Sequence, residues 1–270
     1  MKILFCGDVV GKAGRKVVIE YLPKLRKLLQ LDMIVINGEN AAHGFGITPK
    51  IYNEFVKNNV DVITLGNHSF DKTDIFPVLT EQNNIIRPLN YPENTVGKGW
   101  CVHTTQAGVK VAVIQILGNV FMRSVENPFI CMENWFNTHK KGIDYDVVIV
   151  DFHAEATAEK VAMSHYLDGR ASLLVGTHTH IPTADAHILP NGTGYMTDIG
   201  MCGDYDSVIG MQKEGALVRF TTTDKKNRLQ PAEISGTFCA VCAEIDDKTG
   251  VATKIFPVRL GAALENTHQL

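Results

Sequence analysis

The chain has 270 residues, of which 45% are hydrophobic and 20% are charged. These proportions are typical of globular proteins and exclude a disordered, collagen-like or low-complexity chain. A chain of this length buries roughly three quarters of its unfolded surface, so a metal found here would be catalytic rather than structural. The 26 basic and 29 acidic residues give a net charge of −3, which disfavours binding to long nucleic acid and leaves a small anionic substrate open.

The apolar stretches and the cysteines indicate the compartment. No stretch approaches the roughly 18 consecutive apolar residues of a transmembrane helix, and the run before Asp8 is too short for a signal peptide. We therefore expect a cytoplasmic protein without a membrane partner. Cys239 and Cys242 form the one Cys-x-x-Cys pair, in a strand-like run. Residues three apart face opposite sides of a strand, so we expect plain buried thiols.

Short apolar runs alternate with segments of helical period along the first half of the chain. In chain order, the pattern predicts strands over 2–7, 33–37, 61–66, 109–117, 146–152 and 172–176, and helices over 13–29, 48–58, 73–82 and 156–167. The run 100–105 is predicted to lie antiparallel to 109–117. Two late strand-like runs, 233–245 and 251–260, flank the turn 246–250.

This alternation indicates the fold class. Strands that alternate with helices form βαβ units with parallel strands. We predict a layered α/β sandwich in a single domain over 1–270, with a mixed, largely parallel central sheet core flanked by helices. We expect the late hairpin to form a second, antiparallel or mixed sheet.

Polar side chains follow several predicted strands, at the point where each strand ends. Because ligands bind outside the carboxyl ends of strands in open α/β sheets, we expect these side chains to meet at one edge of one sheet. All are residue types that bind metals, and none is a thiol. In chain order they are Asp8, Asn37-Gly38-Glu39-Asn40, Asn67-His68, His153 and His178-Thr179-His180.

Each of these signals has an ordinary structural interpretation when it is taken alone. Asp8 could cap the following helix, Asn37-Gly38 could form a turn, and His153 could be a structural histidine. His178 and His180 form a sharper signal, because at a strand period of two both imidazoles point the same way and can chelate. The coincidence of all the signals at one edge favours a metal site.

Two basic residues follow Asp8 near the start of the first predicted helix. Lys12 and Arg15 lie where a helix N-terminus favours phosphate. They are equally typical of a solvated helix face, so this interpretation stays open.

These motifs together resemble a known family, the calcineurin-like dinuclear metallophosphoesterases. The resemblance is closest to the bacterial YmdB-like branch, and it runs from Lys2 to about Gly210. Two positions depart from the broader superfamily and match this branch: Val10 stands where a histidine is usual, and Glu39 stands where the bridging aspartate is usual. The motifs that carry the resemblance are Gly7-Asp8-Val9-Val10-Gly11, Ile36-Asn37-Gly38-Glu39-Asn40-Ala41-Ala42-His43-Gly44, Gly66-Asn67-His68, Asp151-Phe152-His153-Ala154-Glu155-Ala156-Thr157 and Val175-Gly176-Thr177-His178-Thr179-His180.

The resemblance implies two metal ions and a phosphodiesterase active on 2′,3′-cyclic nucleotides. One metal would be held by Asp8, Glu39, Asn40 and His180. The other would be held by Glu39, Asn67, His153 and His178, with Glu39 as the bridge. His68 is not a ligand in this scheme, because its counterpart in the family protonates the leaving oxygen, a role that suits an imidazole near neutral pH.

The implied ligand set also bears on the metals and the reaction. Two cations about 3.5–4 Å apart can hold a hydroxide between them and bind the phosphoryl oxygens. Mixed oxygen and nitrogen ligands suit iron, manganese, zinc or cobalt. The resemblance favours iron first, then manganese, with zinc as a further alternative.

We therefore expect a cytoplasmic, dinuclear metal-dependent phosphodiesterase that hydrolyses small cyclic nucleotides, with a metal-bridging hydroxide and His68 as general acid. Two alternatives stay open: a phosphomonoesterase or nucleotidase on the same site, and a regulatory metal-binding protein with incidental turnover. The sequence also leaves open a homo-oligomer and the native metal.

Overall fold

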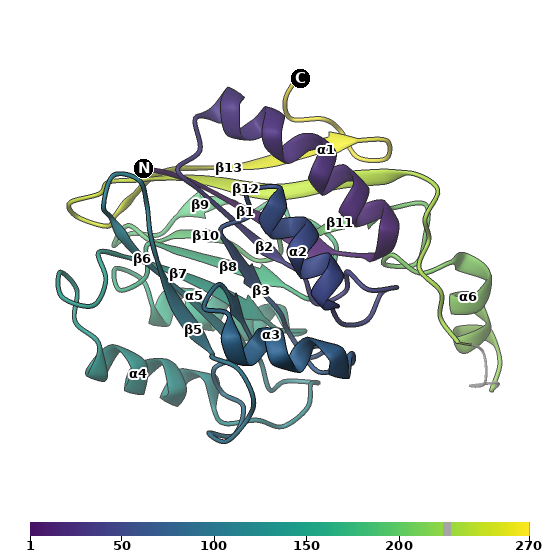
Figure 1. Cartoon of the computed structure of the whole chain (residues 1–270), viewed down its shortest axis with the longest axis horizontal. Helices are drawn as coiled ribbons and strands as arrows, with labels where there is room; N and C mark the ends of the chain where they lie inside the picture. The colour runs from purple at the N-terminus through teal and green to yellow at the C-terminus, as the bar shows by residue number, and fades with distance from the viewer. Residues whose placement is uncertain (224–227, 270) are drawn as a thin grey trace.

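A computed structural model describes residues 1–223 and 228–269 of the chain. Two β-sheets pack face to face, and helices cover the outer face of each (Figure 1). The predicted fold class, an α/β sandwich with largely parallel strands, is confirmed. The predicted arrangement of the strands in the sheets is wrong in two respects, which are described below.

The first sheet has seven strands in the order β13-β12-β11-β1-β2-β3-β4. β1 lies parallel to β2 and β11, whereas the β12–β13 hairpin is antiparallel to its neighbours. The late hairpin therefore extends this sheet and does not form a second one. The strand bounds are β1 (Lys2–Val9), β2 (Met33–Asn37), β3 (Val62–Thr64), β4 (Ile85–Ile86), β11 (Met201–Asp204), β12 (Gly236–Ile245) and β13 (Ala252–Gly261).

The second sheet has six strands in the order β5-β6-β7-β8-β10-β9. Its inner strands are parallel, and β5 is antiparallel to β6 as predicted. The strands predicted to share one sheet are thus divided between two, because buried strands read alike in sequence whichever sheet they join. The bounds are β5 (Trp100–Thr104), β6 (Lys110–Leu117), β7 (Val147–His153), β8 (Leu173–Thr177), β9 (His187–Ile188) and β10 (Gly194–Met196).

The helices lie on the outer faces of the sheets (Figure 1). α6 differs from the others, because it projects beyond the edge of the sheets. α2 begins where the sequence predicts, because the Thr48 hydroxyl accepts a hydrogen bond from the Ile51 N–H and Pro49 occupies the first turn. Neither α4 nor α6 was predicted from the sequence, and the short strands β4, β9, β10 and β11 were also missed. The helix bounds are α1 (Gly11–Leu29), α2 (Pro49–Lys57), α3 (Phe76–Glu81, after a 3₁₀ turn over Thr73–Ile75), α4 (Pro128–Thr138), α5 (Thr157–Tyr166) and α6 (Lys213–Thr221).

Apolar side chains form a core in each gap between layers. The middle core, between the sheets, joins Phe5 of β1 to Val113 of β6 and Ile149 of β7. The outer cores pack Leu22 of α1 on the first sheet and Trp135 of α4 on the second. The sheets are therefore held face to face by apolar burial on both sides of each strand, which brings their strand ends together.

The cysteines are buried within these cores and carry no disulfide. All are free in the structure. Burial raises the pKa of Cys239 and of Cys242 to about 12, which keeps both protonated and unreactive. The expectation of plain buried thiols is confirmed. Over 1–223 and 228–269, no helix combines the length and apolarity that crossing a membrane requires.

A close backbone contact at the end of β1 generates a stability prediction. β1 bulges against β2 between Cys6 and Asp8, and a Cβ on Gly7 would collide with the carbonyl oxygen of Gly200. We expect Gly7→Ala to destabilise the protein by about 3 kcal/mol or more, because the backbone at Gly7 or at Gly200 must move to make room for the added Cβ. The matched control is Gly215→Ala in α6, where the nearest atom lies 3.8 Å away. Urea denaturation should show the control within about 1 kcal/mol of wild type, and equal midpoints for both variants would contradict the prediction.

Candidate metal centre and active site

The predicted site residues come from strand ends in both sheets. Asp8 lies near the end of β1, Glu39 and Asn40 follow β2, and Asn67 and His68 follow β3. From the facing sheet, His153 ends β7, and His178 and His180 follow β8. Packing of the two sheets brings them into one cluster, so the predicted single edge of one sheet is instead a junction between two.

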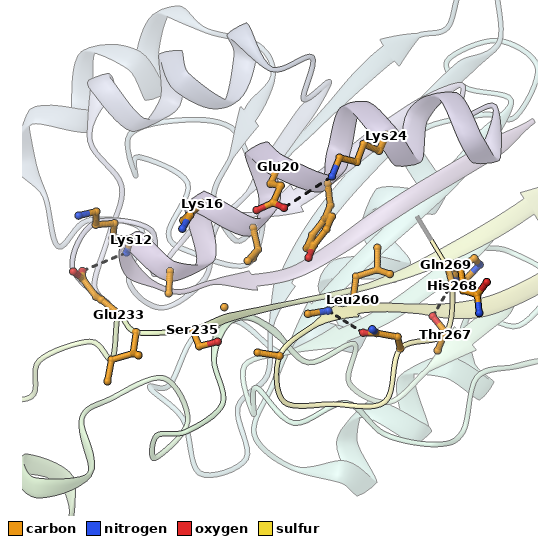
Figure 2. A pocket seen from close by; sticks show the side chains of 18 residues that line it. Lys12, Lys16, Glu20, Lys24, Glu233, Ser235, Leu260, Thr267, His268 and Gln269 are labelled. Atoms are coloured by element: carbon orange, nitrogen blue, oxygen red, sulfur yellow. Dashed lines mark hydrogen bonds and ion pairs between the residues drawn. The ribbon is translucent and has the colours of Figure 1, made fainter.

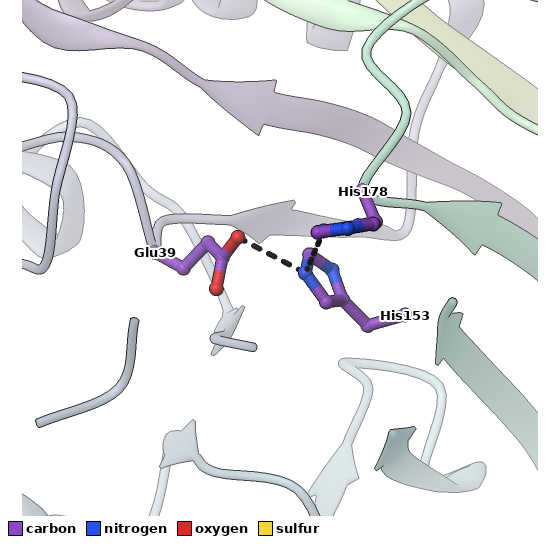
Figure 3. Close-up of side chains that lie close together, drawn as sticks. All are labelled: Glu39, His153 and His178. Carbon is purple, nitrogen blue, oxygen red and sulfur yellow. Dashed lines mark hydrogen bonds and ion pairs between the residues drawn. The ribbon is translucent and has the colours of Figure 1, made fainter. Parts of the chain in front are cut away.

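A compact group of ligand atoms surrounds the Nε2 atom of His153. Glu39 Oε1 lies 3.0 Å away, Asn67 Oδ1 2.9 Å away and His178 Nδ1 3.1 Å away. Figure 3 shows Glu39, His153 and His178 converging, and one ligand atom of each lies within 4.8 Å of the others. Carboxylate, amide and imidazole atoms at this spacing could hold one metal ion.

A second, looser group meets the first at Glu39 Oε1. His180 Nε2 is 3.2 Å from Asn40 Nδ2 and 3.9 Å from Asp8 Oδ1. Asn40 Nδ2 also donates to Glu39 Oε1 at 3.3 Å. Asn40 therefore turns its amide nitrogen toward this group, and ligation through its oxygen needs a half-turn of the amide.

The burial of this cluster tests whether a cation fits. Asp8, Glu39 and His153 are at most 1% exposed, and within the described residues Asp8 Oδ1 has no hydrogen-bond partner. Burial raises the pKa of Asp8 to about 6, only partly offset by His180 and His153. An orphaned carboxylate oxygen in a buried site is costly, and a cation would satisfy it. The residues present therefore fit a metal ion.

Glu39 and His153 stabilise each other when no cation is bound. Burial opposes both charges, but the adjacent His153 holds the pKa of Glu39 below its usual range. Conversely, burial lowers the pKa of His153, but Glu39, together with Asp8 and Asp151, outweighs this effect and raises the pKa above the usual value. Burial and the neighbouring His153 lower the pKa of His178 to about 3, which keeps the lone pair of His178 available to a metal.

Each of the clustered imidazoles is held through the nitrogen that faces away from the cluster. Such contacts fix the ring orientation and the tautomer, so that the other nitrogen can bind a metal. The holding contacts are Thr177 Oγ1 at 2.8 Å from His153 Nδ1, Glu155 Oε2 at 3.3 Å from His178 Nε2, and the carbonyl oxygen of Ile209 at 2.8 Å from His180 Nδ1.

Behind His153 lies a buried carboxylate to which the sequence-based prediction gave no role. Asp151 Oδ1 accepts a hydrogen bond from Thr177 Oγ1 at 2.7 Å. Its Oδ2 accepts from side chains on three further strands. The sequence carried one signal for this role, since Asp151 is a charged residue within an otherwise apolar predicted strand. The donors to Oδ2 are Asn37 Nδ2 of β2 at 3.1 Å, Thr64 Oγ1 of β3 at 2.5 Å and Gln115 Nε2 of β6 at 3.2 Å.

The loop that carries His178 and His180 departs from the predicted strand geometry. β8 ends at Thr177, and both histidines adopt positive φ angles, 96° and 67°. The predicted strand geometry at these two residues is therefore wrong, and the imidazoles join different groups. Asp198 fixes this strained loop, because its Oδ2 accepts from Thr179 N at 3.2 Å and from Lys160 Nζ at 2.8 Å, in an ion pair whose side chains are 1% exposed.

His68 lies beside the two groups of candidate ligands and outside them. Its backbone N–H donates to Glu39 Oε2 at 2.9 Å. Its Nδ1 lies 2.7 Å from Asp71 Oδ2, and its ring meets the edge of Phe45 with 5.1 Å between ring centroids. These contacts leave Nε2 as the ring nitrogen for a substrate. Asp71 and Phe45 carry no signal that sequence alone could separate from an ordinary loop.

A cavity of about 270 Å³ opens onto this cluster. Glu39, His68, His178 and His180 form one side of it, and apolar side chains form much of the rest. A larger cavity, of about 1120 Å³, lies between α1 and the region of β12 and β13 (Figure 2). Lys12 lines this second cavity, whereas Arg15 binds the Ala41 carbonyl and Glu54. Neither Lys12 nor Arg15 therefore supports the prediction of a phosphate site beside the candidate ligands.

Comparisons with known proteins identify the family to which this chain is similar. A family model described as YmdB-like protein matches residues 4–258. A 2′,3′-cyclic-nucleotide 2′-phosphodiesterase of Bacillus subtilis strain 168 is 46% identical over 255 residues, which cover 94% of this chain and 95% of that protein.

Solved structures share the fold over nearly the whole chain. A crystal structure of a hypothetical protein from Thermus thermophilus is 38% identical, has a TM-score of 0.91 and covers 97% of this chain and 100% of its own. A structure described as a novel phosphatase from Mycoplasma pneumoniae is 33% identical, has a TM-score of 0.90 and covers 97% and 93%. Since the family model and these relatives each span almost all of it, the chain belongs to the YmdB-like protein family.

Proposed function

We propose that the chain is a metal-dependent phosphodiesterase that hydrolyses 2′,3′-cyclic nucleotides. The observation that carries this proposal is the convergence of Glu39, Asn67 and His178 on His153 Nε2, beside an orphaned Asp8 oxygen and below a cavity that His68 lines. The 46% identical relative, named a 2′,3′-cyclic-nucleotide 2′-phosphodiesterase, supports the substrate class. The coarser statement, that the chain is a hydrolase of phosphoester bonds, also agrees with the relative described as a phosphatase.

The proposed ligands divide into two sets that share Glu39. Asp8, Asn40 and His180 would hold one ion with it, and Asn67, His153 and His178 would hold the other. Bound ions of this kind supply positive charge to the phosphate and lower the pKa of water. The donor set of oxygen and imidazole nitrogen supports iron first, with manganese or zinc as alternatives.

His68 is proposed to handle the leaving group. In hydrolysis, a water oxygen adds to phosphorus and the bond to the ribose 2′ oxygen breaks, leaving a 3′-monophosphate. The 2′ oxygen is a poor leaving group and needs a proton, which His68 Nε2 can donate. Asp71, 2.7 Å from Nδ1, would hold the ring in the required orientation as a positioning residue.

Two other functions would use the same residues. The relative described as a novel phosphatase favours a phosphomonoesterase as the second candidate. A regulatory metal-binding protein would need the metals but not turnover. A variant that lacks only His68 separates this possibility, because it should keep the regulatory effect and lose hydrolysis.

Three wider properties are part of the same proposal. The middle core joins residues of both sheets, which supports one metallophosphoesterase domain over 1–270. Free, buried cysteines support a reducing compartment, the cytoplasm. A homo-oligomer stays a prediction that light scattering would test.

The shared ligand generates the first prediction of this proposal. Glu39→Ala should lose both metal ions, because Glu39 belongs to both ligand groups. Elemental analysis of the purified protein should find about two ions per wild-type chain and close to none in the variant. Glu54→Ala is the matched control, since that surface glutamate pairs with Arg15. Two tightly bound ions in the Glu39 variant would contradict the bridging role.

The buried Asp8 carboxylate generates a pH prediction for the metal-free protein. The pKa of Asp8 is about 6 in the folded chain, against 3.8 for a free side chain. A raised pKa adds stability at low pH that is lost as pH rises through about 6, because the buried group must then ionise. Asp8→Asn removes this loss, so its stability advantage in chelator-treated protein should grow by up to about 3 kcal/mol between pH 4 and 7.5.

Urea denaturation at both pH values measures this effect. Asp74→Asn, at an exposed position, should show no growing advantage. Excess metal should reduce the advantage of Asp8→Asn at pH 7.5, because a cation stabilises the wild-type carboxylate. An advantage that is the same at pH 4 and 7.5 would reject the buried, ionising Asp8.

The role of His68 can be separated from metal binding by the choice of leaving group. His68→Ala should keep both ions and lose roughly 10²–10⁴ in turnover of a 2′,3′-cyclic nucleotide, the usual size of a general acid contribution. Turnover of a p-nitrophenyl phosphate ester by the same variant should fall about tenfold or less, because p-nitrophenolate leaves without a proton. His103→Ala on β5 is the control. Equal losses on both substrates with the ions intact would leave His68 as a phosphate-binding group.

A further inference from the structure

The cavity beside the metal-binding groups has an apolar wall that the proposed reaction does not use. We call Phe45, Ile209, Met211 and Phe220, which all line the cavity, the apolar wall. Ile209 is 48% exposed and Phe220 82% exposed. Large exposed apolar side chains next to a charged site are typical of a ligand surface.

The apolar wall is fixed in position relative to the ligand groups. The Ile209 carbonyl oxygen holds His180 Nδ1 at 2.8 Å, and Phe45 packs edge-on against the His68 ring. Ile209 has a positive φ of 46°, a strained conformation for a β-branched residue. Ile209 therefore connects the apolar wall to His180, and Phe45 connects it to His68.

α6 completes this wall from the outside. Ala216 of α6 is 4% exposed and also lines the cavity, so the helix presents a small buried residue there. Met211 is anchored next to the helix by backbone hydrogen bonds with Val208 in both directions. Phe220 extends from the last turn of α6, where the helix projects beyond the sheets (Figure 1).

The chemistry of the cavity divides the substrate between its two sides. A cyclic phosphate carries the negative charge and belongs beside Glu39, His68 and the histidines that would hold metal. A nucleobase has an apolar planar face, which aromatic side chains bind by stacking at about 1–3 kcal/mol per base. We propose that the apolar wall is the nucleobase subsite of this enzyme, with Phe220 as its stacking residue. This inference rests on the proposed function.

The test compares substrates with and without a base. Adenosine 2′,3′-cyclic phosphate carries one, whereas ethylene phosphate has the same five-membered cyclic diester and lacks both base and ribose. For Phe220→Ala, we expect kcat/KM on the nucleotide to fall about 5- to 150-fold, as loss of one stacking contact predicts. The kcat/KM of Phe220→Ala on ethylene phosphate should change far less, because this substrate has no base to stack. Phe220→Trp should keep a kcat/KM on the nucleotide close to that of the wild type.

The matched control is another exposed phenylalanine. Phe121 is 89% exposed and is absent from the cavity lining, so Phe121→Ala should leave both substrates unchanged. Equal losses on the two substrates in Phe220→Ala would overturn the subsite. Dissociation of an oligomer by Phe220→Ala, seen by light scattering together with equal losses, would also overturn it and identify the wall as a contact between copies of the chain.

Binding separates failure of this inference from failure of the proposed function. Saturation-transfer NMR with adenosine and with ribose reports base binding without any hydrolysis. Binding of adenosine that Phe220→Ala abolishes would support the subsite even if the wild-type protein cleaved neither substrate. Hydrolysis of the nucleotide with equal binding of adenosine by wild type and variant would overturn the subsite and leave the proposed function standing.

Discussion

The arrangement of this site depends on one buried carboxylate, Asp151. It accepts hydrogen bonds from side chains on β2, β3, β6 and β8, and so ties the facing sheets together where their strands end. Through Thr177 it also orients His153, the imidazole on which the tighter ligand group converges. A buried acceptor with this many donors is stable only while all of them are in place, so sheet packing and histidine orientation are coupled.

The same burial makes the site costly for the chain without a cation. Asp8 keeps an oxygen with no partner among the described residues, and burial raises its pKa. The loop after β8 holds two residues at positive φ, and Asp198 and Lys160 hold that loop with a buried ion pair. Such features destabilise the fold locally and are typical of functional sites, where the arrangement serves binding rather than stability.

Much of the fold and of the site could be predicted from local sequence. The strand and helix pattern predicts the α/β class, and the motifs after the strands predict Asp8, Glu39, His153 and their neighbours, because strand ends are where a sheet presents ligands. The division of strands into two sheets was missed, since strands such as β7 are buried along their whole length and carry no alternation. Glu155 and Asp198 were missed because their partners, His178 and Lys160, are distant in the sequence. Asp71 was missed because it lies in a loop with no recognisable pattern.

The sequence by itself therefore determined which residue types stand at the ends of the strands, because hydrophobic period and turn residues act over short distances. Only the tertiary structure decided which atoms meet. Packing of the two sheets places His153 beside Glu39 and His180 beside Asn40, and loop geometry after β8 sends His178 and His180 to different groups. The tertiary structure also places the apolar wall beside the ligand groups, because it brings Phe45 and Phe220 to one cavity. Contacts between residues so far apart in the sequence depend on how whole sheets and helices pack on one another, and no local sequence pattern encodes that packing.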